Sequence, residues 1–391
     1  MKVPNVLFVL VQTNAAADGG IASISHVVGG LRRHRPIIVT DRPGERVDQW
    51  RRQGIETHVV PQSASKGLLR NPLATIRSYV RYASAIRHIL RSSDARLVHA
   101  NDPLSLQLSL VPGKLAGAKL LFNLRGTFDP ARPPWRLKYR LLFGFSDHVL
   151  FLSRDMARRW EEFVGRANAK SSVTYSIVDA QRFGPAALPK GGKPIILVCG
   201  LVRPLKGQLE FLRNVAPRLV EHGNTIWFAG DFDPRGDAYM AACAEAATSL
   251  GPAVQFLGYR NDIPELMREA TVVAVPSRHE GLVRAMIEAM SCARPVVSFD
   301  ISSAREMLED ESGGAGMVVE WGDFAGMAEA ILRYCNDRAL ASAAGEKGVA
   351  AARRLFSAAA VTERYERAYD LLASEDRAGP KKSLDKAAQV D

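Results

Sequence analysis

The sequence lacks the cysteine arrangements that mark zinc sites and disulfide frameworks. Its 391 residues include four cysteines, at widely separated positions, and no C-x-x-C pair. A structural zinc site needs closely spaced ligands, and a disulfide framework needs many cysteines in a short chain. Neither class is therefore indicated. We expect reduced, buried thiols at Cys199, Cys243, Cys292 and Cys335.

Long apolar runs are missing as well. No run approaches the roughly 20 apolar residues of a membrane-spanning helix. The first residues faintly resemble a signal peptide, but the apolar run Val6–Val11 is short and a glycine pair follows it. We interpret this run as the first buried strand of an α/β domain. The expectation is a cytoplasmic protein that does not cross a bilayer.

Acidic residues are scarce in the first half of the chain. Residues 1–180 hold 27 lysines and arginines against 13 acidic residues, whereas the remaining residues hold 25 against 28. This asymmetry points to an anionic partner of the first half. Nucleic acid is not indicated, because aromatic residues are only 7% and no helix-turn-helix, zinc knuckle or RNP-like motif occurs.

One helical pattern, Pro72–Arg91, combines basic and apolar residues. Its arginines are interleaved with Ile76, Val80, Ile86 and Leu90, and helical spacing separates an apolar face from a basic face. The helix is either a solvated surface helix or a contact with anionic lipid headgroups. The lipid interpretation is supported by a second basic segment that contains Arg132, Trp135, Arg136, Lys138 and Arg140.

Short apolar segments alternate with helical patterns through the whole chain, which favours parallel sheets with right-handed crossovers. The expected strands are Val6–Val11, Pro36–Thr40, Glu56–Val60, Leu97–His99, Leu120–Leu124, His148–Leu152, Pro194–Cys199, Thr225–Ala229, Val254–Leu257, Thr271–Val275, Pro295–Phe299 and Gly316–Val319. Two Rossmann-like domains follow, over residues 1–183 and 184–357, with a linker at Phe183–Pro194. Residues 376–391 have little apolar content, and we expect them to be disordered.

The most informative stretch runs from Pro276 to Glu306. Glu280 follows one expected strand, and Glu288 comes eight residues later inside an expected helix. Ligands of parallel sheets bind at the carboxyl ends of strands, and a helix start favours a phosphate. The two carboxylates are therefore expected to flank a diphosphate and to accept hydrogen bonds from hydroxyl groups on either side of it. A nucleotide sugar has that layout.

Two cations follow the first strand of the second half. Arg203 and Lys206 lie three residues apart at a strand exit, where they can hold a diphosphate. The alternative is two solvated cations at a helix start. The segment lacks the G-x-x-x-x-G-K-[ST] pattern of a P-loop. Residues at neighbouring strand ends are further candidates for this side of the site: Gly230, Asp231, Tyr259 and Arg260.

The first half supplies candidates for an acceptor or diphosphate loop. Gly19 and Gly20 precede a helical pattern, where backbone N–H groups can approach an anion, although a plain tight turn is the alternative. No G-x-G-x-x-G follows, so a dinucleotide is not indicated. His99 and Asp102 end another strand, and His99 is either structural or directed to the cleft. Arg125 lies at a strand end, where a guanidinium needs an anion or water.

Together these residues resemble the family 4 glycosyltransferases of the GT-B fold, over about residues 5–372. The E-x7-E pattern matches at Glu280 and Glu288, and the basic pair of the donor loop matches at Arg203 and Lys206. Ser176–Phe183 is similar to the N-G-V-D-x-x-x-F segment of the family. The resemblance implies two Rossmann-like domains that face a central cleft, and a helix at residues 358–375 that returns to the N-terminal domain.

The resemblance also implies roles for these residues. Glu288 would bind the ribose hydroxyls of a nucleotide-sugar donor, and Glu280 would lie near the sugar. Arg203 and Lys206 would neutralise the diphosphate. Backbone groups would assist them at Gly281, Leu282, Val283 and Arg284. The family retains anomeric configuration and typically needs no metal, so we expect neither a metal nor another cofactor.

The chain departs from the family pattern at three places. Arg125 replaces the histidine that many members place near the donor sugar. Val283 and Arg284 occupy positions where many members have glycine, and Ser176 and Ile177 stand where the family has asparagine and glycine.

We therefore expect a retaining transferase of the hexosyltransferase type. It would move a sugar from a UDP- or GDP-sugar to a lipid-linked or glycan acceptor in cell-surface polysaccharide or glycolipid synthesis. It would be peripheral on the inner face of the cell membrane. The alternatives are a GT-B-fold sugar-nucleotide epimerase and a non-catalytic sugar-nucleotide-binding subunit.

Overall fold

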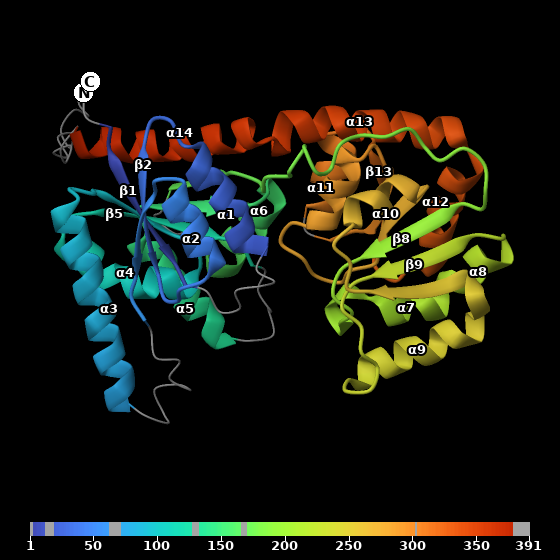
Figure 1. Cartoon of the computed structure of the whole chain (residues 1–391), viewed down its shortest axis with the longest axis horizontal. Coiled ribbons are helices and arrows are strands. Elements are labelled where there is room, and N and C mark those ends of the chain that lie inside the picture. Colours follow the sequence, from blue (N-terminus) through green and yellow to red (C-terminus); the bar gives the residue numbers. More distant parts are fainter. Residues whose placement is uncertain are drawn as a thin grey trace, which may run out of the picture.

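Two parallel sheets of seven and six strands organise the chain into two domains (Figure 1). The computed structural model describes residues 3–11, 19–61, 72–126, 133–165, 170–301 and 303–377. Apolar residues fill nearly every position of the central strands, because helices cover both faces of each sheet. The predicted pair of parallel α/β sheets is confirmed.

The N-terminal sheet has the order β3-β2-β1-β4-β5-β6-β7. Its strands are β1 (Asn5–Leu10), β2 (Arg35–Thr40), β3 (Glu56–Val59), β4 (Leu97–Ala100), β5 (Lys119–Leu124), β6 (His148–Phe151) and β7 (Lys170–Val173). Its helices are α1 (Gly19–Gly30), α2 (Glu45–Arg52), α3 (Pro72–Ser92), α4 (Pro103–Leu115), α5 (Pro133–Phe145) and α6 (Arg154–Val164). The strand order reverses between β1 and β4, and such a reversal marks the usual binding position of an α/β sheet.

The C-terminal sheet has the order β10-β9-β8-β11-β12-β13, so its reversal lies between β8 and β11. Its strands are β8 (Ile195–Cys199), β9 (Thr225–Ala229), β10 (Val254–Gly258), β11 (Val272–Val275), β12 (Val296–Phe299) and β13 (Gly316–Val319). Its helical segments are η1 (Pro204–Lys206), α7 (Gln208–Asn214), α8 (Ala216–Glu221), α9 (Ala238–Leu250), η2 (Gly251–Ala253), α10 (Ile263–Glu269), α11 (Arg284–Ser291), the π-helix η3 (Glu306–Asp310) and α12 (Phe324–Asn336).

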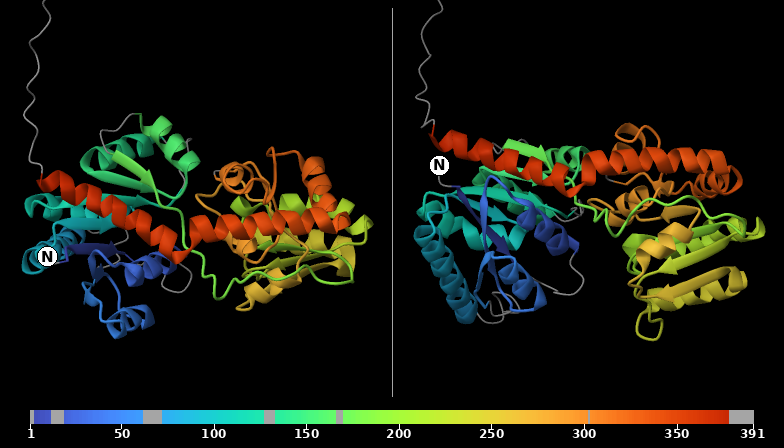
Figure 2. Two further views of the ribbon diagram at one scale, coloured as in Figure 1. Left: turned by 90° about the horizontal axis from the view of Figure 1, so that it is seen from above. Right: turned by 45° about the horizontal axis from the view of Figure 1, so that its top comes forward.

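Two consecutive helices at the end of the described chain span both domains. α13 (Arg338–Phe356) packs on α11, and α14 (Ala358–Arg377) packs on α1 of the N-terminal domain. Figure 2 shows them almost end to end across the molecule. The two helices join at Ser357, where Val178 of the interdomain segment donates its N–H to the Phe356 carbonyl over 2.9 Å. The two chain crossings between the domains therefore lie side by side.

All twelve expected strands are present, and β7 is an additional one. α14 includes residues 376 and 377 of the stretch expected to be disordered, and residues 378–391 lie outside the described residues, as does Arg132. In the part of the chain that the structure describes, no helix is both long and apolar enough to cross a membrane. The four cysteines are free thiols.

Candidate active site in the interdomain cleft

The two strand-order reversals face each other across a cavity of about 500 Å³. We call it the cleft cavity. Segments that follow β1, β4, β5 and β6 form its N-terminal side, and segments that follow β8 and β11 form its C-terminal side. The cavity is lined by Val11, Gly20, Ile21, Asn101, Asp102, Arg125, Gly126, Leu152, Ser176, Lys206, Glu280, Leu282 and Arg284. Predicted site residues from both halves of the chain therefore meet in one place.

An ion pair joins the two C-terminal segments of the cavity. Lys206, the last residue of η1, forms a close ion pair with Glu280 in the loop after β11. The Ser277 hydroxyl also donates to Glu280, over 3.2 Å. Gly207 has φ +71° and lies directly under the Pro276 carbonyl, because a Cβ there would come within 2.0 Å of that oxygen. The glycine thus allows η1 to approach the loop closely enough for the pair to form.

A second ion pair lies on the first turns of α11. The Arg284 guanidinium donates to the Glu288 carboxylate over 2.9 Å. Arg284 lines the cleft cavity, and the side chain of Glu288 is 12% exposed behind it. Among the described residues, no side chain caps the start of α11 at Val283, so the first N–H groups of the helix are available to an anion.

The N-terminal side of the cavity presents Arg125, which follows β5. Its Nη2 donates to the Ser176 hydroxyl over 3.2 Å. A Cβ on Gly281 would come within 2.8 Å of the Arg125 carbonyl oxygen, so the two domains are in close contact here. Asp102 caps α4 by accepting the N–H groups of Leu104 and Ser105. Gly20 lies in the first turn of α1, which begins at Gly19.

Several predicted donor residues lie at the carboxyl edge of the C-terminal sheet without lining the cleft cavity. Arg203 is exposed at the start of η1, and Asp231 is exposed after β9. Tyr259 is 73% exposed, and Arg260 pairs with Asp262. Gly230 packs against the Gly200 carbonyl, where a Cβ would come within 1.9 Å.

Of the two interpretations of His99, the structure supports the structural one, so its place among the candidate residues of the acceptor or diphosphate loop needs correction. His99 is fully buried on β4, stacks on Phe8 and shares a 2.9 Å hydrogen bond with the Tyr369 hydroxyl of α14. Burial, together with the nearby charge of Arg125, lowers its pKa to about 3. His99 is therefore a neutral residue that helps to anchor α14.

Glu306 forms a cross-domain contact that the sequence interpretation missed. Its carboxylate, on η3 of the C-terminal domain, accepts the N–H groups of Arg154 and Asp155 at the start of α6, over 3.1 and 3.0 Å. It also accepts the Tyr175 hydroxyl over 2.8 Å. Burial and this carboxylate raise the pKa of Tyr175 well above its ordinary value. Glu306 is the last residue of the informative stretch Pro276–Glu306. Its partners lie more than 130 residues earlier in the sequence, so this contact could not be predicted from the stretch alone.

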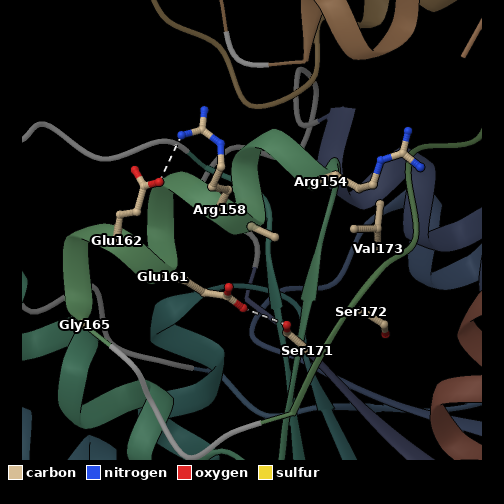
Figure 3. A pocket seen from close by; sticks show the side chains of 9 residues that line it. Arg154, Arg158, Glu161, Glu162, Gly165, Ser171, Ser172 and Val173 are labelled. Carbon is tan, nitrogen blue, oxygen red and sulfur yellow. Dashed lines mark hydrogen bonds and ion pairs between the residues drawn. The ribbon is translucent and has the colours of Figure 1, made fainter. Parts of the chain in front are cut away.

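A larger hollow of about 620 Å³ lies between α6 and β7, apart from the cleft cavity (Figure 3). Several of its lining side chains are paired: Arg158 with Glu162, Arg154 with Glu311, and the Ser171 hydroxyl donates to Glu161. None of the predicted site residues lines it. We therefore place the candidate active site in the cleft cavity and not in this hollow.

Comparison with known proteins supports the resemblance. The model of the glycosyl transferase 4-like domain matches residues 19–173, and the model of the glycosyl transferases group 1 matches residues 193–337. The chain belongs to the family 4-type glycosyltransferases. Each family model covers one of the two sheets that face the cleft cavity.

Two curated relatives illustrate this family. A lipopolysaccharide core biosynthesis mannosyltransferase of Rhizobium leguminosarum is 32% identical over 46% of this chain and 51% of its own. A phosphatidyl-myo-inositol mannosyltransferase of Mycobacterium leprae is 25% identical over 74% of this chain and 77% of its own. The chain thus spans between one half and about three quarters of these relatives.

Solved structures share the GT-B fold of this glycosyltransferase. The Anabaena protein HepE, solved in complex with UDP, superposes with a TM-score of 0.77 at 20% identity, over 94% of this chain and 100% of its own. Among the described residues no group of histidine, cysteine, aspartate and glutamate could hold a metal ion. The charged groups of the cleft cavity are instead three cations and two carboxylates.

Proposed function

We propose that this glycosyltransferase moves a sugar from a UDP- or GDP-sugar to a hydroxyl of a lipid-linked or glycan acceptor, with retention of configuration. The observation that carries the proposal is that two ion pairs, Lys206 with Glu280 and Arg284 with Glu288, meet at one cavity between the domains, which Lys206, Glu280 and Arg284 line. HepE was solved with UDP, and the named activities of the two relatives support saccharide and lipid acceptors.

In this proposal the C-terminal domain holds the donor. Glu288 accepts hydrogen bonds from the ribose hydroxyls, and the start of α11 faces the diphosphate. Negative charge grows on the diphosphate as its bond to the sugar breaks, and Lys206 and Arg203 stabilise that charge. Because Glu280 holds Lys206 in the cavity before the donor binds, little reorganisation is needed. Glu280 then lies beside the sugar.

The N-terminal domain holds the acceptor in the same cavity. The acceptor oxygen bonds to the anomeric carbon on the face that the diphosphate leaves, and its proton passes to the leaving phosphate. No metal enters this scheme, because fixed cations supply the positive charge. Closure of the two domains would exclude water and limit hydrolysis of the donor.

Transfer assays with site variants test the proposal. Lys206→Ala should lower transfer roughly 100-fold or more, the order found when one group that stabilises transition-state charge is removed. Glu288→Ala should also lower transfer strongly, because the ribose hydroxyls of the donor lose their acceptor. Arg213→Ala is the matched control, because Arg213 is an exposed cation on α7 outside the cavity. Full turnover in the Lys206 and Glu288 variants would refute the site assignment.

Three adjacent helices of the N-terminal domain support a peripheral contact with membranes. α3 packs on α4, and α4 packs on α5. Together they contain eight lysines and arginines and no acidic residue. Each helix exposes large apolar side chains at helical spacing: Leu73, Ile76 and Val80 on α3, Leu104, Val111 and Leu115 on α4, and Leu137, Leu141 and Phe145 on α5. We call these outward side chains the three-helix surface.

The apolar stripe of α3 divides in two, which refines the sequence interpretation. Ile86 and Leu90 are buried in the domain, whereas Ile76 and Val80 are more than half exposed. Figure 1 shows that the N-terminal half of α3 extends beyond the sheet. We propose that the three-helix surface contacts an anionic bilayer, since exposed apolar residues flanked by cations match its interior and its headgroups.

Vesicle co-sedimentation tests this contact. Binding should require anionic lipid, and Arg77→Gln with Arg81→Gln should weaken it about 30-fold, from roughly 1 kcal/mol per cation. Ile76→Ser with Val80→Ser should weaken it as well. Arg51→Gln with Arg52→Gln removes two exposed cations on α2 and serves as the control. Equal binding to neutral and anionic vesicles would overturn the proposal.

A further inference from the structure

Arg125 differs from the other two cations of the cleft cavity because it has no acidic partner among the residues that the structure describes. Lys206 pairs with Glu280, and Arg284 pairs with Glu288. Arg125 Nη2 has the Ser176 hydroxyl, at 3.2 Å, while its Nη1 is buried without a hydrogen-bond partner among the residues that the structure describes.

One hydroxyl group does not satisfy this side chain. A guanidinium carries five N–H donors and remains charged at every working pH. A buried donor that lacks a partner costs free energy. The planar pair of terminal nitrogens matches the two oxygens of a carboxylate or a phosphate.

The position of Arg125 places such an anion near the reacting end of the donor. Arg125 lines the cleft cavity together with Lys206 and Glu280, and its backbone carbonyl lies against Gly281. In the proposed function Lys206 and Arg203 already neutralise the diphosphate, and they come from the opposite domain. The charge of Arg125 therefore matches a second anionic group in the same cavity.

We propose that Arg125 binds a carboxylate or phosphate carried by the transferred sugar or by the acceptor. This inference rests on the proposed function and narrows its substrates to anionic saccharides or glycosyl phosphates. Ser176 would orient the guanidinium by its hydrogen bond. The shared chemistry is an oxyanion held by two parallel N–H donors.

Calorimetric titrations with matched pairs of probes test the inference. The donor arm compares UDP-glucuronate with UDP-glucose and GDP-mannuronate with GDP-mannose. The acceptor arm compares methyl glucuronide with methyl glucoside, and glucose 1-phosphate with glucose, each in the presence of UDP or GDP. The anionic member of at least one pair should bind roughly tenfold to hundredfold more tightly, as expected for a charge-assisted bidentate contact.

Variants connect the preference to the residue. Arg125→Gln should abolish the ratio of affinities within the preferred pair, and Arg125→Lys should keep part of it. Arg158→Gln removes an exposed arginine of the hollow between α6 and β7 and should leave the ratio of affinities unchanged. Equal affinities within every pair for the wild-type protein would overturn the inference, as would an unchanged ratio in Arg125→Gln. Binding of UDP or GDP in the same titrations, together with sugar transfer in the assays of the proposed function, would show that the proposed function stands even then.

Discussion

Replacing Glu306 with glutamine should weaken the connection between the two domains. The carboxylate accepts two backbone N–H groups at the start of α6 and the Tyr175 hydroxyl, and it is only 5% exposed. An amide keeps one acceptor oxygen but turns an NH₂ group toward the second partner. One buried N–H group then lacks a partner, at a cost of about 1–3 kcal/mol. Loss of the negative charge at a helix N-terminus adds up to roughly 1 kcal/mol.

We therefore expect Glu306→Gln to lower the free energy of unfolding by about 1–4 kcal/mol, the sum of those two contributions. Urea titration followed by circular dichroism measures this change. Because the lost contact joins the domains, the unfolding transition should also broaden or divide into two steps. Scattering in solution should show a larger radius of gyration for the variant.

Asp310→Asn is the matched control for this experiment. Asp310 ends the same short helix and is exposed, so its substitution should change stability by no more than about 0.5 kcal/mol. If Glu306→Gln and Asp310→Asn unfold at the same urea concentration as the wild-type protein, Glu306 does not couple the domains.

Two further predictions concern acid sensitivity and the loop under the Lys206–Glu280 pair. The pKa of His99 is about 3 in the folded protein, against the ordinary value of 6.5 in the unfolded chain. Between these two values the unfolded chain binds more protons than the folded protein. The free energy of unfolding should therefore fall as the pH is lowered from 7 to 5, by up to about 1.4 kcal/mol per pH unit below 6.5. His99→Phe should flatten this profile in urea titrations, and an equally steep profile would contradict it. Gly207→Ala should weaken nucleotide binding and destabilise the protein more than Gly223→Ala, because both glycines have positive φ but only the first faces a carbonyl. Equal losses in the two alanine variants would exclude the close approach of η1 to Pro276.

The strands could be predicted because most of them are short apolar runs. β7 was missed, because three of the four residues of its sequence KSSV are polar and the first two are exposed. This segment forms an edge strand because it pairs with β6 and not because of its own sequence pattern. Glu280 and Lys206 could be placed in one cavity, because the segments that carry them follow the two strands that flank the same strand-order reversal.

Contacts between distant segments could not be predicted in this way. The position of His99 at a strand end left open whether it faces the cleft. The structure decides this, because its face of β4 is covered by Tyr369, which is 270 residues away. Periodicity gave α3 an apolar stripe without showing where the helix leaves the sheet. Only the fold reveals that Ile76 is exposed while Ile86 is buried.

Calorimetric titration of nucleoside diphosphates into the wild-type protein and Lys206→Ala tests the central claim most directly. The account predicts that UDP or GDP binds at one site per chain, more tightly than the corresponding monophosphate, and that Lys206→Ala removes this advantage of the second phosphate. Equal affinities for mono- and diphosphates in the wild-type protein, or an undiminished advantage in the variant, would contradict a donor diphosphate held by Lys206 in the cleft cavity.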